Sequence, residues 1–564
     1  MSKNKKILLV SLLTCTLLSS CGLVDLEEIL NGIITNPFNS STNRQSSIEP
    51  EEGYYIITFK FNNGEEDVQV KVEERDRVDR PNDPYKKGYE FIGWYYNNEL
   101  FDFNTRIRKS ITLTAQYQKN ASTGQTISKY DFGNSLFEDG LMSDGPLTEG
   151  VLPSKMTNNK NPSILVFPVR LSSNYNSSTY DKYLEDIEKT FIGDSYSTGW
   201  ESVRSYYFQS SYGSINFNIT VWDEWFYDSA ITTTKLQKYY DSYYNGTGDI
   251  DPNEYLLTKV LDRYDSQIDY SKYDSNNDSY IDAIWFVYDT PVNFEDSDSM
   301  FWAYCSTSYE WYDESYEDYV NPSKSRDGVY SLYYAWAGVD FMYPNPNTGN
   351  YDTDNLVVDA HTFIHETGHL MGLDDYYDYN ENSGANTGVY GADMMDSAIG
   401  DHCSISKLLL GWVQPYYAYN RGKYTLELES FTISGDCILI SDGQINSIYS
   451  SYYLVEYYTN DGLNSDDTPI PDGDGIRIFK VNAELNYVNG VVDYNDGNYV
   501  TSFKYDNSDT NIPFVEMLSN DKIYYDQVSY YNLINEDQSF ENDDIIVENL
   551  GIINGKVCVE ITIK

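Results

Sequence analysis

The chain has 564 residues, which is too many for one compact core, so we expect three or four structural units. Hydrophobic residues make up 40% of it and aromatic residues 16%, a composition that excludes a wholly disordered protein. The formal net charge of −50 excludes a general nucleic-acid binder, because a duplex would repel such a polyanion. Most of the acidity fits a solvated surface, and the remaining carboxylates are candidates for holding divalent cations.

Residues 1–20 have the organisation of an export signal. Three lysines precede an apolar stretch at 7–18, which is too short for a transmembrane helix. The stretch ends in Leu-Ser-Ser-Cys-Gly, which resembles a bacterial lipobox, where the signal is removed before the cysteine and the thiol is lipidated. The resemblance implies an exported protein at the cell surface, anchored by a lipid on Cys21 to the outer face of the cytoplasmic membrane. The alternative is an ordinary cleaved signal with a chance cysteine.

The next segments are a tether and a small module. Residues 21–53 are polar and fit a tether. Alternating runs at 57–61 and 68–72 flank Asn63-Gly64, which predicts a tight hairpin turn. The arrangement G-Y-x-F-x-G-W-Y, F-D-F-N and L-x-A-x-Y that follows resembles the internalin-type B-repeat over residues 54–118. This resemblance implies a β-grasp spacer or adhesive module without catalysis.

The rest of the chain predicts a mixed domain followed by an all-β domain, so the fold class is multidomain α+β. Residues 119–155 are typical of a linker or pro-segment, and 156–415 form the next domain. Its expected strands are 164–169, 215–221 and 284–288, and its expected helices are 181–191, 202–210 and one that starts near Asp354. Residues 416–564 have no long helical period, and alternating runs predict strands at 424–428, 453–457 and 476–481.

Four cysteines remain after Cys15 in the signal and Cys21 at its end. No C-x-x-C is present, so a cysteine zinc site or a redox motif is not supported. Cys437 and Cys558 both lie in strand-like runs and could pair with each other, but with Cys305 and Cys403 present three pairings are open.

Only four histidines occur, and three of them fall within nine residues. His365 and His369 belong to an H-E-x-x-H string, and on a helix positions i and i+4 share one face, so both can reach one zinc ion at about 2.0–2.1 Å. Glu366 lies beside them and can take a proton from the attacking water. His361 lies roughly 12 Å along the helix axis from His369, so it has a supporting or packing role. The alternative is a core helix whose histidines bond to their neighbours.

A third ligand is expected after the helix turns back. Gly372 can take the left-handed conformation there, and Asp375 follows three residues later. The string H-E-x-x-H-x-x-G-x-x-D resembles the zinc-binding run of the metzincins, which implies a methionine turn under the metal, for which we choose Met395. A thermolysin-type ligand, Glu381, is the weaker alternative because its surroundings look like a loop.

The segment HETGHLMGLDDYYD at 365–378 resembles the active-site run of the immune-inhibitor-A family of secreted bacterial metallopeptidases. Supporting matches extend the similarity over roughly residues 160–490, and they lie at 202–213, 395–412, 453–457 and 475–481. Two departures concern the rim of the site: Asp374 stands where the family usually has proline, and Asp396 where a small hydroxyl residue is usual. The resemblance implies a metzincin-like zinc peptidase domain.

A second cation site is predicted in a run of alternating oxygen-bearing residues. Calcium loops place ligands at such positions, and related peptidases that resemble this chain here bind calcium structurally. The run lacks the glycine and the glutamate of a complete EF-hand, and an Asx-rich turn before a strand is the alternative. Its members are Asp274, Asn276, Asp278, Tyr280 and Asp282.

The favoured function is a surface-anchored, monomeric zinc endopeptidase that hydrolyses protein or peptide substrates and carries structural calcium. The first alternative is a lipoprotein adhesin or binding protein with a vestigial zinc site, against which the intact Glu366 argues. The second is a nutrient-capturing lipoprotein, to which the zinc motif gives no role. His402 follows the methionine turn, and contact with substrate and simple packing both remain open for it.

Overall fold

A computed structural model describes much of the chain from Gly53 to Lys564. The predicted signal at 1–20, Cys21 and nearly all of the tether at 21–53 lie outside the described residues, as does Glu381. Within the described part, no helix is both long enough and apolar enough to cross a bilayer. The described ranges are 53–64, 67–84, 86, 89–119, 125, 127–132, 161–248, 251–290, 300–307, 312–313, 318–319, 325–343, 357–377, 388–389, 391–397, 399–465, 473–485, 487–488, 491–492, 503–507, 512–520, 533–553 and 555–564.

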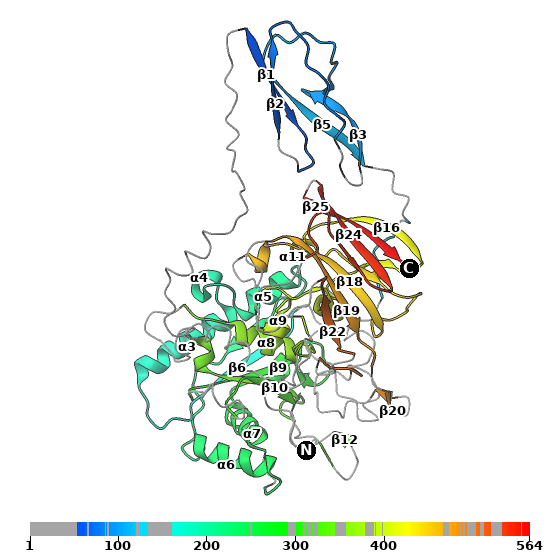
Figure 1. The fold of residues 1–564 in the computed structure, drawn as a ribbon. Helices are drawn as coiled ribbons and strands as arrows, with labels where there is room; N and C mark the ends of the chain where they lie inside the picture. Colours follow the sequence, from blue (N-terminus) through cyan, green and yellow to red (C-terminus); the bar gives the residue numbers. More distant parts are fainter. Residues whose placement is uncertain are drawn as a thin grey trace, which may run out of the picture. The chain divides into compact units, whose positions relative to one another are not determined.

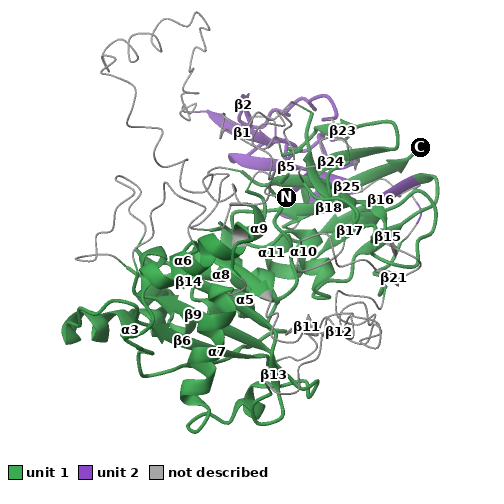
Figure 2. Cartoon of the chain, turned by 90° about the horizontal axis from the view of Figure 1, so that it is seen from below, with its two compact units in different colours: residues 1–19, 127–422, 426–564 green, residues 20–126, 423–425 purple. Residues whose placement is uncertain are grey.

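The described residues form two compact units with mixed helices and sheets, which confirms a multidomain α+β protein (Figure 2). One unit takes its residues from Ser20–Thr126 and Lys423–Thr425, and the other from Ile127–Gly422 and Leu426–Lys564. Each unit is described by itself below.

The N-terminal unit contains a five-stranded sheet in the order β2-β1-β5-β3-β4. Trp94, with 1% of its surface exposed, lies at the centre of the core, and its ring packs edge-on against Phe59 and Phe91. The aromatic residues of the repeat motif therefore build this core. The strands are β1 (Tyr54–Lys60), β2 (Val68–Glu73), β3 (Tyr89–Tyr96), β4 (Glu99–Leu100) and β5 (Ile111–Lys119).

The predicted strands β1 and β2 are confirmed as an antiparallel pair, but the predicted tight turn between them is wrong. Strand β1 ends at Lys60 and β2 begins at Val68, so seven residues separate the two strands, more than a two-residue turn. Asn62 and Gly64 both have positive φ, 55° and 92°, and Asn63-Gly64 therefore lies inside this wider loop. The Asn63-Gly64 pair therefore marks the place where the chain reverses, but it does not determine the length of the loop.

A second five-stranded sheet, in the order β10-β14-β9-β6-β7, organises the first part of the larger unit. Its strands run parallel except for β10, which is antiparallel to β14 and forms one edge. The expected strands at 164–169 and 284–288 are confirmed, and the one expected at 215–221 is shorter than predicted. The strands are β6 (Ser163–Val169), β7 (Asn218–Val221), β9 (Ala283–Tyr288), β10 (Tyr304–Thr307) and β14 (Tyr333–Gly338).

Helices cover both faces of this sheet (Figure 1). On one face, Trp285 of β9 packs against Phe191 of α3 and Phe363 of α8. On the other, Phe167 of β6 stacks on Tyr264 of α7, so β6 and β9 are buried from both sides. The helices expected at 181–191 and 202–210 are confirmed. The helices are α3 (Ser177–Ile192), α5 (Val203–Ser210), α6 (Thr233–Tyr244), α7 (Pro252–Tyr264) and α8 (His361–Leu370).

The C-terminal region is mostly β, and it includes the strands expected near 424–428, 453–457 and 476–481. Two sheets are present, β15-β17-β18-β19-β22 and β16-β25-β24-β23. One hydrophobic core continues from the helix-covered sheet into the first of these, through residues such as Leu454 and Phe479. Cys305, Cys403, Cys437 and Cys558 form no disulfide in the described structure. The strands are β15 (Tyr416–Ala418), β16 (Gly422–Leu428), β17 (Cys437–Ile440), β18 (Ser451–Tyr458), β19 (Gly475–Asn482), β22 (Val515–Leu518), β23 (Ser539–Glu541), β24 (Ile545–Ile553) and β25 (Lys556–Ile563).

Candidate metal centre

Helix α8 carries the H-E-x-x-H string, but it begins later than the sequence predicts. Residues 357–360 are not helical, so the predicted start near Asp354 is wrong, and that residue lies outside the described ranges. The Asp359 carboxylate accepts a hydrogen bond from the backbone N–H of His361 at 2.9 Å, which satisfies one of the open donors of the first turn. Asp359 itself is held by a hydrogen bond from its backbone N–H to the carbonyl of the distant Met342 at 2.9 Å.

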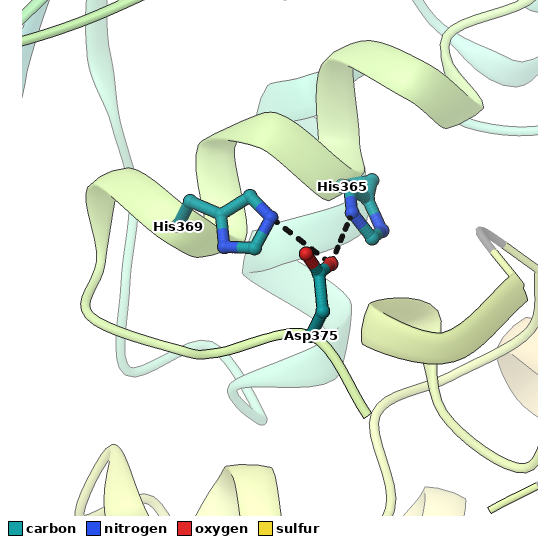
Figure 3. Close-up of side chains that lie close together, drawn as sticks. All are labelled: His365, His369 and Asp375. Atoms are coloured by element: carbon teal, nitrogen blue, oxygen red, sulfur yellow. Dashed lines mark ion pairs between the residues drawn. The ribbon is translucent and has the colours of Figure 1, made fainter. Parts of the chain in front are cut away.

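His365, His369 and Asp375 point toward one another (Figure 3). The Asp375 Oδ1 atom lies 3.0 Å from His365 Nε2 and 3.1 Å from His369 Nε2. Ligand atoms around a tetrahedral zinc at about 2.0–2.1 Å stand roughly 3.3 Å apart, so this spacing is near that of a zinc site. Among the described residues, these three make up the one group of histidine, cysteine and carboxylate side chains close enough to hold a metal ion.

Both imidazoles have their Nδ1 atoms committed to carbonyl oxygens. His365 Nδ1 lies 2.9 Å from the Met394 oxygen, and His369 Nδ1 lies 2.8 Å from the Leu373 oxygen. A carbonyl can only accept, so each Nδ1 donates its proton and each Nε2 is left as the ligand atom. The Nε2 atom of His365 is buried and makes no hydrogen bond of good geometry in the described structure, although Asp375 is near. A metal ion would satisfy it, so the donor set fits zinc.

The charges of the site compensate one another. Burial would lower the pKa of His369, but the Asp375 carboxylate outweighs this and raises that pKa to about 9. Burial acts in the opposite sense on Asp375, whose pKa the two imidazoles hold well below its usual value. Without a cation the pocket therefore favours a protonated His369 beside a carboxylate, and a bound cation would take the place of that proton.

Glu366 is buried next to the two histidines, with 2% of its surface exposed. Burial raises the pKa of its carboxyl group, and the neighbouring imidazoles and the backbone N–H of Cys305 oppose the rise. A carboxylate with a raised pKa is a stronger base than a solvated one, which suits proton abstraction.

The turn after α8 brings Asp375 back toward the histidines as predicted. Gly372 has φ of 103°, a conformation that favours glycine. The next segment is fixed by a hydrogen bond from the Tyr376 N–H to the Met395 carbonyl at 2.9 Å. Met395 lies directly under α8, because a Cβ placed on Gly368 would be only 2.4 Å from its sulfur. The short segment that carries Met395 therefore packs against α8 at Gly368.

A buried carboxylate that the sequence reading did not single out holds this turn. Asp393 accepts hydrogen bonds from the backbone N–H groups of Met395 at 2.8 Å and Cys403 at 2.6 Å, and His402 Nδ1 lies 3.1 Å away. His402 is fully buried, and its ring contacts those of Tyr206, Tyr207 and Trp412. In the described structure His402 thus lies buried among these aromatic rings, beside Asp393. The ring of His361 stacks on Trp200 with centroids 4.5 Å apart.

Asp374 and Asp396, the two residues that depart from the pattern the sequence resembles, lie close to the candidate metal group. Asp374 precedes Asp375 and is half-buried. Asp396 accepts a hydrogen bond from the Gly391 N–H, and burial raises the pKa of its carboxyl group to about 7. A shorter hydroxyl side chain at this position would carry no charge.

The predicted calcium loop is organised by its own carboxylates. Asp274 accepts from the N–H groups of Asp278 and Ser279, both at 3.0 Å. Ser279 stands at the position where an EF-hand has glycine, and it adopts φ of 72° without one. Asp282 accepts from the backbone N–H of Ser163 at 2.6 Å and from the backbone N–H of Ser275, inside the loop, at 3.1 Å. Burial raises the pKa of its carboxyl group to about 7. Asp282 therefore ties the loop to the first residue of β6.

Replacing Asp278 with Ala tests calcium binding in this loop. Asp278 accepts from the Tyr280 N–H and from Asn276 Nδ2, both at 2.9 Å, so its loss costs about 1 kcal/mol per bond without calcium. If calcium binds, millimolar calcium raises the melting temperature of the native chain, and the variant loses that increment. Thermal unfolding with calcium and with chelator measures both the loss of stability without calcium and the increment that calcium adds, with magnesium as the control cation. An equal loss in the two conditions would show that the loop holds no calcium.

Comparisons with known proteins identify the N-terminal module. Residues 55–116 match the family described as the Listeria-Bacteroides repeat domain, which confirms a repeat of bacterial surface proteins in the segment predicted at 54–118. A protein of Evansella cellulosilytica, called "Putative membrane protein", is 29% identical over 99 residues. That match covers 17% of this chain and 15% of the relative.

Proposed function

We propose that the protein is a zinc-dependent endopeptidase of the bacterial cell envelope. The observation that carries the proposal is the convergence of His365 Nε2 and His369 Nε2 on Asp375 Oδ1, at 3.0 and 3.1 Å, beside a buried glutamate. The sequence resemblance to the immune-inhibitor-A family and the position of Met395 under α8 support a metzincin-type domain.

In the proposed reaction, His365, His369 and Asp375 would hold the zinc. A zinc ion at this position would act as a Lewis acid toward the scissile carbonyl and the attacking water. Glu366 takes a proton from that water as it attacks and passes it to the leaving amine. The carbonyl partners of the two Nδ1 atoms keep both imidazoles in the required tautomer and orientation.

The decisive experiment measures zinc content and cleavage together. The chain from residue 21 onward, with Cys21→Ser, is expected to bind about one zinc and to cleave casein or gelatin. Cleavage should stop with 1,10-phenanthroline and return on adding zinc. His365→Ala should lose both metal and cleavage, because one of three ligands is removed. His361→Asn, on the same helix but outside the ligand group, should keep both.

The opposite outcomes are equally informative. Cleavage that persists through chelation would contradict a metal mechanism. Zinc loss in His361→Asn that equals the loss in His365→Ala would contradict the ligand assignment.

A second candidate function is a surface adhesin or binding protein whose zinc site is vestigial. The match of residues 55–116 to a repeat domain favours it, since such modules act as spacers or binding elements. About one zinc per chain, with no cleavage of any protein offered, would support this function over the first.

A location at the cell envelope is supported by the repeat and by the name of the Evansella relative, "Putative membrane protein". The lipobox-like sequence at Cys21 adds a lipid anchor to this proposal. Labelling of wild type and Cys21→Ser with a radioactive fatty acid distinguishes anchoring from simple secretion.

A further inference from the structure

A short segment of the predicted linker extends the C-terminal sheet. Residues 127–132 run antiparallel to β15, the outer strand of the sheet β15-β17-β18-β19-β22, and Lys129 pairs with Tyr416. The Tyr130 N–H donates to the Pro415 carbonyl at 2.9 Å, and the Tyr417 N–H donates to the Ser128 carbonyl at 3.2 Å. The segment thus covers an exposed sheet edge as an added strand.

Side chains reinforce this backbone pairing. Lys129 Nζ lies 2.8 Å from Asp436 Oδ1, and Asp436 is only 12% exposed. Burial would lower the pKa of Lys129, but the hydrogen bond to Asp436 and the attraction of its negative charge together outweigh burial and raise that pKa. The rings of Tyr130 and Phe132 lie 5.4 and 5.1 Å from Tyr417, and Phe132 also packs against the main core. A charge pair and an aromatic cluster therefore hold the two ends of the segment.

We propose that residues 127–132 are a non-covalent clasp, and that the β15 edge with Tyr417 and Asp436 is its docking surface. The clasp fastens everything N-terminal to it, including the repeat, to the C-terminal sheet independently of the covalent path through residues 133–160. A chain cut in that path stays associated. If Cys21 carries a lipid, the remaining chain is then retained at the membrane after such a cut. This inference goes beyond the proposed peptidase activity and does not depend on it.

The test cuts the chain and asks whether the two fragments stay together. A site for a sequence-specific protease replaces residues 143–149 in the Cys21→Ser chain from residue 21 onward. Glu366→Gln is included to remove any activity of the protein itself. After complete cleavage, judged on a denaturing gel, the fragments of the parent chain are expected to co-elute in size-exclusion chromatography at about 10 µM.

Variants in residues 127–132 test whether the clasp is what keeps the two fragments together. Lys129→Glu places a negative charge against Asp436, and Phe132→Ala removes one ring of the cluster; each should raise the dissociation constant of the fragments about tenfold or more. Lys129→Arg keeps the charge and should retain association. Each uncut variant should melt as a folded chain, which excludes unfolding as the reason for release. Separation of the parent fragments, or equal retention by all variants, would overturn the proposal.

Discussion

Replacing Glu366 with Gln is expected to reduce kcat/KM for peptide cleavage by about 10² to 10⁴-fold, the usual contribution of a general base. Glutamine has nearly the same shape but cannot accept the proton of the attacking water. Its neutral amide should fit the buried position, because burial already raises the pKa of the carboxyl group and so disfavours its charged form. Zinc content and melting temperature are therefore expected to stay close to those of the native chain.

Loss of cleavage together with unchanged zinc content would separate a role of Glu366 in catalysis from a role in metal binding. Steady-state cleavage of a fluorogenic peptide library, zinc analysis and thermal unfolding are measured on the same preparation. Loss of cleavage with zinc retained agrees with a base role for Glu366. Equal cleavage by both proteins would show that another group takes the proton, and joint loss of zinc and cleavage would point to a structural role for Glu366.

The sequence predicts the candidate metal group well because that group is local. His365, His369 and Asp375 fall within eleven residues, so helix periodicity and one left-handed glycine are enough to bring them together. The buried strands β6 and β9 could be predicted equally well, because each is a short apolar run in the sequence. Features that depend on contacts between distant residues leave no such local pattern.

Three misses share that physical cause. The start of α8 depends on how residues 357–360 are held, and the length of the β1–β2 connection depends on strand register. The pairing of residues 127–132 with β15 joins segments far apart in the chain, with no periodic pattern to reveal it. For the support of the segment that contains Met395 a signal existed. Glu456 is the one charged residue of the run 453–457, and Arg477 lies between two isoleucines, which indicates a buried pair.

Glu456 and Arg477 connect the C-terminal sheet to the segment that contains Met395. They face each other on the paired strands β18 and β19, and Arg477 Nε donates to Glu456 Oε1 at 2.7 Å. Glu456 also accepts from the Ser404 N–H at 2.7 Å, and Arg477 donates to the Ala392 carbonyl at 3.2 Å. The pair thus holds both ends of the segment that contains Asp393 and Met395.

Arg477→Met is expected to destabilise the fold by roughly 3–5 kcal/mol, because it leaves the Glu456 carboxylate buried without its partner. The double variant Arg477→Met/Glu456→Gln removes both charges and should recover part of this loss. Chemical denaturation of the native chain, the two single variants and the double variant gives the coupling free energy. Losses that simply add in the double variant would show that the two side chains act independently.

The same variants test whether the C-terminal sheet supports the metal group. The carbonyl oxygen of Met394, which accepts from His365 Nδ1, lies in the segment that Glu456 and Arg477 hold. Loosening this segment should therefore weaken zinc retention in Arg477→Met at temperatures where the chain is still folded. Zinc release to a chromophoric chelator measures this. Lys564→Met, which removes an exposed ion pair with Glu541 in the other C-terminal sheet, is the control and should leave the release rate unchanged. An unchanged rate of zinc release in Arg477→Met would show that the buried pair stabilises the fold without supporting the metal group.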